Sequence, residues 1–211
     1  MSVNTTDKGL LTAENCVVVF IDPQPQMLAA VSSIDHGDLL NNMVILAKTA
    51  KIFDVPVVLS VMVAGGYAGC LSAPLQEIFP EQRPVTRTGL NAWDSVEFLT
   101  AVQATRRKNL VIAALWTEVC LVMPGLQALT DGFGVYAVED ASGSVSRTGH
   151  AAAHRRVEQA GGVTITAMQF LLELQRDWSR TGHLEAVQAV IREHGAAYGG
   201  GPGGLPSADP G

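Results

Sequence analysis

The chain has 211 residues, of which 47% are hydrophobic and 16% are charged, a balance that excludes a disordered or fibrous protein. Its formal net charge of -6 argues against a nucleic-acid partner, because binding to phosphates draws on clustered Lys and Arg. No apolar run reaches the roughly 20 residues that cross a bilayer, and the first residues lack the pattern of a secretion signal. We therefore expect a cytoplasmic protein with no membrane partner.

Short apolar runs rich in Val and Ile recur along the chain, as is typical of strands buried on both faces of a parallel sheet. They are Cys16–Ile21, Pro56–Met62, Asn109–Leu115, Gly134–Val138 and Val163–Thr166. Segments with helical spacing lie between and after them, namely Leu39–Phe53, Ser95–Arg106, Glu118–Thr130, Ala151–Ala160, Met168–Trp178 and Leu184–His194. This alternation predicts an α/β fold with right-handed crossovers.

Helix ends carry signals that agree with this pattern. Asp94 stands where an N-cap belongs, and Gly132 and Gly161 follow helices where a left-handed residue is favoured. No interior linker interrupts the pattern, so we expect one domain over residues 1–197 and a Gly/Pro-rich flexible tail over 198–211.

In open parallel sheets ligands bind beyond the carboxyl ends of the strands, so residues that follow strands are the first candidates for a site. Asp22 follows the first strand, where an apolar wall would raise its proton affinity; a turn-capping Asp before Pro23 is an equally good interpretation. Cys120 lies where a strand gives way to a helix, and the helix dipole there favours a thiolate. An inert buried thiol is the alternative for Cys120.

Arg87 lies in a predicted loop and would lower the pKa of the Cys120 thiol if it faced inward, although most loop arginines are solvated. We assign no catalytic role to Cys16 or Cys70. His150 and His154 are four residues apart, but no third ligand is evident, so a solvated helix face is favoured over a metal site.

Four motifs in this order resemble the isochorismatase-like cysteine hydrolases, and most closely the YcaC-like branch. They are the run Val17–Gln24, the segment Arg87–Asp94, the run Thr117–Cys120 and the run Asp140–Gly143. The similarity extends from about Glu14 to Trp178. It implies a three-layer α/β/α sandwich with a Rossmann-like parallel sheet of about six strands.

The resemblance also implies a catalytic triad of Asp22, Arg87 and Cys120, where many relatives carry Lys in place of Arg. A cis peptide at Leu115–Trp116 would present the Trp116 N–H, together with the Cys120 N–H, as an oxyanion hole. Because the metal-binding Asp and His of the nicotinamidase branch have no counterpart after Met62, we expect no metal and no cofactor. Gln24, Asn91 and Trp93 are the predicted substrate-binding residues.

We therefore expect a cofactor-free hydrolase that cleaves a small amide, imide or related C–N substrate through a thioester on Cys120. The alternatives are a thiol redox or peroxide-responsive protein, with Cys70 as resolving partner, and a non-catalytic oligomeric relative. The resemblance implies a homo-oligomer, and the apolar helix around Phe170–Leu174 is the predicted interface.

Overall fold

The computed structural model describes residues 9–64, 66–67 and 69–195. Six strands form one sheet in the order β3-β2-β1-β4-β5-β6, and every neighbouring pair is parallel. The strands are β1 (Cys16–Ile21), β2 (Val57–Met62), β3 (Val85–Arg87), β4 (Asn109–Ala114), β5 (Gly134–Val138) and β6 (Val163–Ile165). The predicted parallel α/β sheet is confirmed, and β1 has the predicted bounds.

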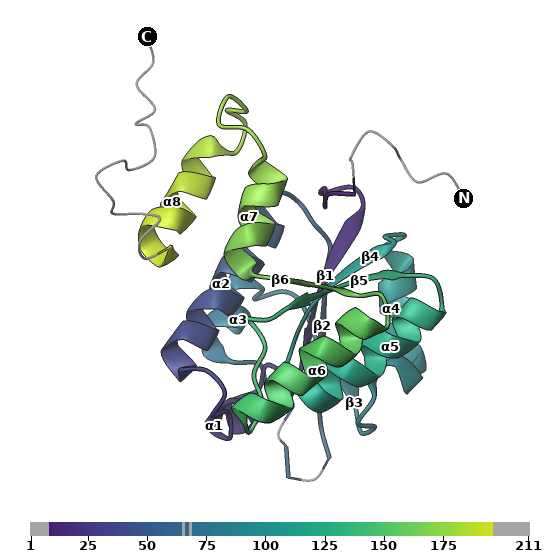
Figure 1. Ribbon diagram of the computed structural model, residues 1–211. Coiled ribbons are helices and arrows are strands. Elements are labelled where there is room, and N and C mark those ends of the chain that lie inside the picture. The colour runs from purple at the N-terminus through teal and green to yellow at the C-terminus, as the bar shows by residue number, and fades with distance from the viewer. Residues whose placement is uncertain (1–8, 65, 68, 196–211) are drawn as a thin grey trace.

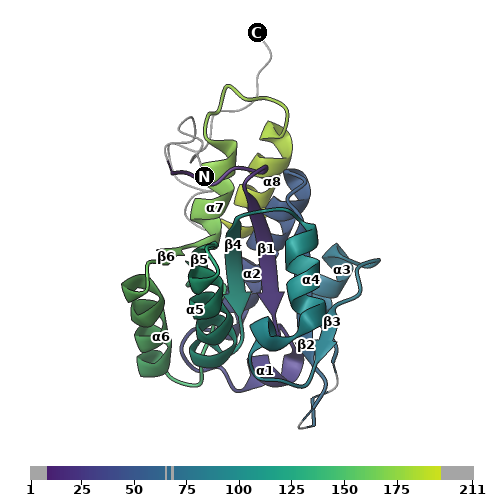
Figure 2. The ribbon, with the colours of Figure 1, turned by 90° about the vertical axis from the view of Figure 1, so that its right-hand side faces the viewer.

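Helices cover both faces of the sheet (Figures 1 and 2). One layer holds α2 (His36–Ile52), α3 (Ala73–Ile78), α7 (Ala167–Gln175) and α8 (Leu184–His194), with α1 (Pro25–Ala29) at its lower end in Figure 1. The opposite layer holds α4 (Val96–Ala104), α5 (Val122–Thr130) and α6 (Arg147–Gln159). The result is the predicted three-layer sandwich.

Alternation along β1 shows why the sheet has two hydrophobic cores. Cys16, Val18 and Phe20 face the core under α2 and α7, whereas Val17, Val19 and Ile21 face the core under α4, α5 and α6. Both sets are buried, because side chains of a strand point alternately to the two faces and both faces are covered by helices.

Three short elements differ from the sequence prediction. Arg87 ends β3 and is not in a loop; this strand has only three residues and an exposed Thr86, so it carries no continuous apolar signal. Helices α1 and α3 have five and six residues and were also missed. The predicted helix Glu118–Thr130 divides into η2 (Thr117–Leu121), a π-helical turn, and α5.

Two predictions about helix ends had different outcomes. Gly132 and Gly161 adopt φ values of 82° and 98°, as expected of residues that follow helices. Asp94 is not the N-cap of α4, because it lies inside the short 3-10 helix η1 (Ala92–Asp94). Ser95 caps α4 instead, where its Oγ accepts a hydrogen bond from the Phe98 N–H at 3.3 Å.

The prediction that the helix around Phe170–Leu174 forms a subunit interface is wrong, because its apolar side chains are not on the surface of the chain. Phe170 and Leu171 are fully buried within the chain's own core, and Leu174 is 4% exposed.

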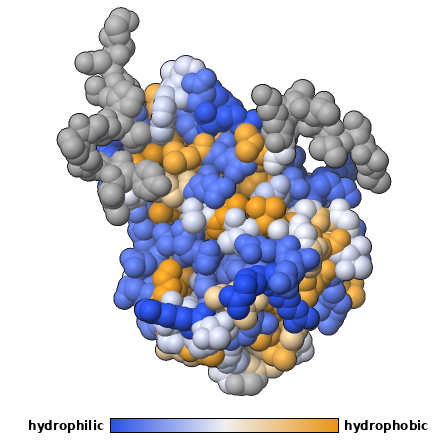
Figure 3. Space-filling view, viewed as in Figure 1, coloured by the Kyte–Doolittle hydropathy of each residue, from blue (hydrophilic) through white to orange (hydrophobic). Residues whose placement is uncertain are grey.

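The outer surface of α6 is hydrophilic (Figure 3). Among the described residues, no helix is long and apolar enough to cross a membrane. The predicted tail over 198–211 lies outside the described residues.

Candidate active site

The strand order reverses beside β1, because β2 and β3 lie on one side of it and β4, β5 and β6 on the other. Such a reversal opens a crevice at the carboxyl ends of the two central strands. Ile21 is in register with Ala114, so Asp22 after β1 lies level with the residues that lead from β4 into η2. This topology brings Asp22 and Cys120 together.

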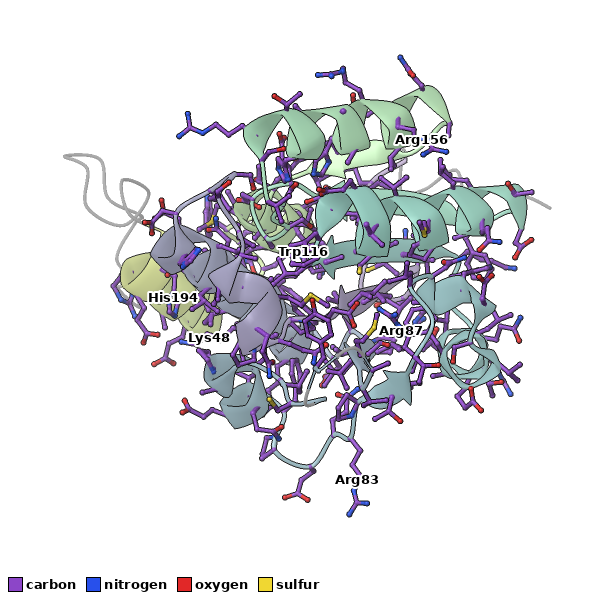
Figure 4. The ribbon with its side chains drawn as sticks, turned by 90° about the horizontal axis from the view of Figure 1, so that it is seen from below. Lys48, Arg83, Arg87, Trp116, Arg156 and His194 are labelled. Carbon is purple, nitrogen blue, oxygen red and sulfur yellow. The ribbon has the colours of Figure 1, made fainter. Side chains whose placement is uncertain are left out.

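Asp22 and Arg87 form a buried ion pair. The Arg87 Nη2 donates to Asp22 Oδ2, and the side chains of Arg87 and Asp22 are 2% and 0% exposed. A second guanidinium nitrogen donates to the Gly89 carbonyl oxygen. Figure 4 shows Arg87 directed into the molecule at this end, whereas Arg83 and Arg156 extend outward. The inward orientation of Arg87 is the one required of a triad member.

The Cys120 thiol lies close enough to the Asp22 carboxyl group to interact with its charge, and it is 2% exposed. Burial raises the pKa of the Cys120 thiol, and the neighbouring charge of Asp22 raises it further. Burial also raises the pKa of Asp22, although Arg87 opposes that shift. Cys120 is therefore a thiol at neutral pH in the resting protein, so the thiolate that we expected from the helix dipole is not the resting form.

The peptide bond between Leu115 and Trp116 is cis, as the resemblance implied. The backbone N–H of Cys120 donates to the Trp116 carbonyl oxygen at 2.8 Å. The Trp116 indole N–H donates to the Met27 carbonyl oxygen at 2.9 Å, which ties the ring to α1. Figure 4 places Trp116 near the centre of this end of the molecule.

The segment Asp140–Gly143 supports the turn that carries Cys120. Ser142 Oγ accepts from the Ala114 N–H at 3.2 Å, and the Gly143 carbonyl oxygen accepts from the Thr117 N–H at 2.9 Å. A Cβ at Gly143 would lie 2.8 Å from a methyl carbon of Val31. Glycine is therefore required here for close packing, which gives this fourth motif a structural role.

The three predicted substrate-binding residues all have partners within the chain. Gln24 is fully buried; its Oε1 accepts from the Met62 N–H at 2.8 Å, and its Nε2 donates to the Met62 carbonyl oxygen at 3.0 Å. Trp93 is 7% exposed, and its indole N–H donates to Asp131 at 2.8 Å. Asn91 caps η1 by accepting from the Trp93 N–H, and it lines a cavity next to Arg87.

The histidine prediction is wrong, because His150 and His154 do not lie on a solvated face. His154 is 3% exposed, and its ring lies 4.6 Å from that of His150. The Nδ1 of His150 is hydrogen-bonded to the Thr117 hydroxyl at 2.8 Å. Burial lowers the pKa of His154 to about 4, so the ring is neutral and packs between α6 and η2. No group of three metal-ligating side chains gathers anywhere in the described part of the chain.

Sequence reasoning missed the roles of Gln24, Ser142, Gly143 and His150 in supporting the site. Each acts through a contact with a backbone or side chain that is distant in sequence. Gln24, Ser142 and Gly143 lie in two of the four motifs, which signalled the site but not these supporting roles, and His150 lies in none of them.

The comparisons with known proteins agree with this geometry. A model of the isochorismatase domain matches residues 16–169. The chain is 37% identical over 185 residues to the probable hydrolase YcaC of Escherichia coli. This alignment covers 87% of this chain and 88% of the relative. YcaC from Pseudomonas aeruginosa, solved with hexane-2,5-diol and covalent acrylamide, has a TM-score of 0.85 at 35% identity and covers 90% of this chain and 94% of its own.

A third comparison is with the structure of E. coli YcaC, described as an octameric hydrolase of unknown specificity. It has a TM-score of 0.83 at 34% identity and covers 88% of this chain and 91% of its own.

Replacement of Gln24 by Leu should lower the free energy of unfolding by about 2–4 kcal/mol, because the Met62 N–H and carbonyl oxygen would be left buried without partners. Urea unfolding at one fixed protein concentration measures the change. The matched control is Gln76→Leu on the exposed surface of α3, with an expected effect within about 0.5 kcal/mol. Equal stability of the two variants would contradict a structural role for Gln24.

Replacement of Asp22 by Asn should lower the pKa of Cys120, because it removes a negative charge from beside the thiol and leaves Arg87 unpaired. Each pKa unit of decrease raises the thiolate fraction about tenfold, so Cys120 should react faster with iodoacetamide at pH 7. Mass spectrometry of the labelled peptides measures the rate.

Two other thiols serve as internal controls for this experiment. Cys70 is exposed and should react at the same rate in both proteins, and Cys16 is buried and should stay unlabelled in both. Labelling of Cys16 in the variant would show local unfolding and not a pKa change. An unchanged rate at Cys120, with Cys16 protected, would refute the electrostatic coupling.

Proposed function

The chain belongs to the isochorismatase family and is a hydrolase of the YcaC-like branch, and we propose that it hydrolyses small amides, imides or related C–N substrates through Cys120. The observation that carries the proposal is the closeness of the buried Cys120 thiol to the Asp22 carboxyl group, which is itself paired with Arg87. A nucleophile beside a base that is oriented by a third group is the arrangement of covalent acyl transfer.

In the first half of the proposed reaction, Asp22 takes the proton of Cys120 as the sulfur attacks the substrate carbonyl carbon. The raised pKa of Asp22 suits this role, because a base must hold the proton once it has accepted it. The C–N bond then breaks, and the departing amine or ammonia takes the proton from Asp22. The acyl group remains on sulfur as a thioester.

In the second half, Asp22 accepts a proton from water as the water oxygen attacks the thioester carbonyl. The C–S bond breaks, the carboxylic acid leaves, and the proton returns to the Cys120 sulfur. Arg87 stays charged throughout, so its proposed role is to hold and neutralise the Asp22 carboxylate.

We propose that the backbone N–H groups of Trp116 and Cys120 stabilise the oxyanion that forms in both halves. The Cys120 N–H already donates to the Trp116 carbonyl oxygen, so it would serve as a shared donor. Three-centre bonds of this kind are common at helix termini.

The covalent acrylamide in the P. aeruginosa relative supports a reactive nucleophile in this branch. Acrylamide reacts with thiols by conjugate addition, in which sulfur bonds to the terminal alkene carbon and a proton goes to the carbon beside the carbonyl. This chemistry provides a probe for Cys120 that does not depend on knowing the substrate.

The thiol redox alternative requires a low-pKa, accessible Cys120. Burial and the Asp22 charge raise the pKa of that thiol instead, and the side chain is 2% exposed. Both observations favour the hydrolase over the redox-responsive protein. Location in the cytoplasm and the absence of a cofactor stay predictions.

Replacement of Cys120 by Ala or Ser should lower amide turnover at least about a thousandfold, because no thioester can form. Ammonia release from a panel of small amides and imides measures turnover, and intact-protein mass spectrometry detects acyl and acrylamide adducts. Cys70→Ala is the matched control and should retain both turnover and adduct formation. Turnover that survives in Cys120→Ala would overturn the proposal.

We also propose that the chain forms a homo-oligomer, as the octameric E. coli YcaC does. Light scattering after gel filtration should then give a mass several times the 22.3 kDa of one chain. Likeness to the octameric relative predicts a mass eight times that of one chain. A mass of 22.3 kDa at micromolar concentration would contradict the proposal.

A further inference from the structure

A cavity of about 570 Å³ lies on the Arg87 side of the triad. It is bounded by the end of β3, the loop that follows, and the first residues of α4, with Val63 after β2 on a further side. Its volume falls in the range of sites that hold small molecules. The cavity therefore has room for a small molecule next to Arg87, the member of the proposed triad that lines it.

More negative than positive side chains line this cavity. Arg87 is the one basic residue among the described residues that line it, and its charge is balanced by the buried ion pair with Asp22. Asp94 and Glu97 add two carboxylates to the lining. The lining is thus negative overall and would attract a cationic ligand.

Local structure holds the Asp94 backbone and the Glu97 carboxylate. The Asp94 N–H donates to the Asn91 carbonyl oxygen within η1, and the Glu97 side chain accepts from the Ser95 hydroxyl at 3.1 Å. Because Ser95 also caps α4, Glu97 is positioned by the start of that helix. Asp94 in η1 and Glu97 in the first turn of α4 thus lie three residues apart at one side of the cavity.

A second feature of the lining indicates a ligand. Arg87 has a side-chain exposure of 2%, and its buried Nε–H has no hydrogen-bond partner among the described residues. Buried N–H groups nearly always have a partner, so this donor is available to an acceptor such as a substrate carbonyl oxygen or a bound water. Two valines, Val63 and Val96, add apolar surface to the lining.

We propose that this cavity selects amide substrates with a positively charged amino group, which Asp94 and Glu97 attract, and that it disfavours substrates with a second carboxylate. A short hydrocarbon linker would lie along the valines and separate the amide from the amino group. This inference rests on the proposed amide hydrolysis and adds the class of substrate.

The test uses three amides of similar length that all release ammonia: 4-aminobutanamide, pentanamide and the monoamide of glutaric acid. Wild type should have its highest kcat/KM with 4-aminobutanamide, which is a cation, and its lowest with the monoamide of glutaric acid, which carries a carboxylate. Two exposed carboxylates together should contribute roughly a 2- to 30-fold preference for the cation over the neutral amide. Added salt should reduce it.

The double variant Asp94→Asn/Glu97→Gln should lose this preference. The matched control is Glu77→Gln/Glu81→Gln, which changes the net charge equally at two exposed residues outside the lining and should keep the preference. Equal kcat/KM for all three amides in wild type, or a preference for the carboxylate, would overturn the inference and leave the proposed hydrolysis intact.

NMR titration of the Cys120→Ala variant with the same three amides measures their affinities. It tests substrate selection independently of turnover. If wild type hydrolyses none of the three, the proposed reaction on such amides fails, and the order of affinities still decides the inference. Tighter binding of the cation that is lost on substitution of Asp94 and Glu97 supports it; equal affinities refute it.

Discussion

The buried ion pair between Asp22 and Arg87 is the interaction on which the rest of this site depends. Neither charge has appreciable contact with water. Removing each ion from water costs several kcal/mol, and the attraction between the two ions offsets this cost only when their geometry is excellent. The sheet supplies that geometry. Asp22 continues β1, Met62 ends β2 and Arg87 ends β3, and the Met62–Arg87 register holds these ends level.

Gln24 reinforces this alignment by bonding both backbone groups of Met62, between the two charged residues. Asp22 itself has a φ of 57°, a left-handed conformation that short polar side chains adopt more readily than most. Cys120 approaches from the other side of β1, on a turn held by the Asp140–Gly143 segment. Cys120 and Asp22, the proposed nucleophile and base, are thus fixed by separate sets of contacts.

The sequence predicted the features that follow from continuous patterns. Strand β1 has its predicted bounds because six consecutive apolar residues can only be buried between two helix layers. It could not predict β3, with three residues, or choose Ser95 over Asp94 as a cap, because both types of residue cap helices. His154 was placed in solvent because burial of a polar ring depends on which element packs over it.

The substrate-binding predictions show a related limit. A sequence motif identifies Gln24 and Trp93 as part of the site region but does not tell a contact with substrate from a contact with backbone. Gln24 bonds Met62, and Trp93 bonds Asp131, through hydrogen bonds that join residues 38 positions apart in each case. Only the folded chain shows that these polar atoms already have partners.

Burial of Asp22, Arg87 and Cys120 also determines how the proposed reaction would start. In the resting site the pKa values of Cys120 and Asp22 are both raised, so moving the proton from sulfur to carboxylate exchanges one buried negative charge for another beside the same Arg87. The total charge of the triad stays constant, and no ion has to enter from water. A buried thiol with a raised pKa is a poor target for oxidants, because the thiolate is the form that reacts. The proposed reactivity therefore belongs to the strand ends, and the proposed selectivity to the β3–α4 connection and the negative cavity that it lines.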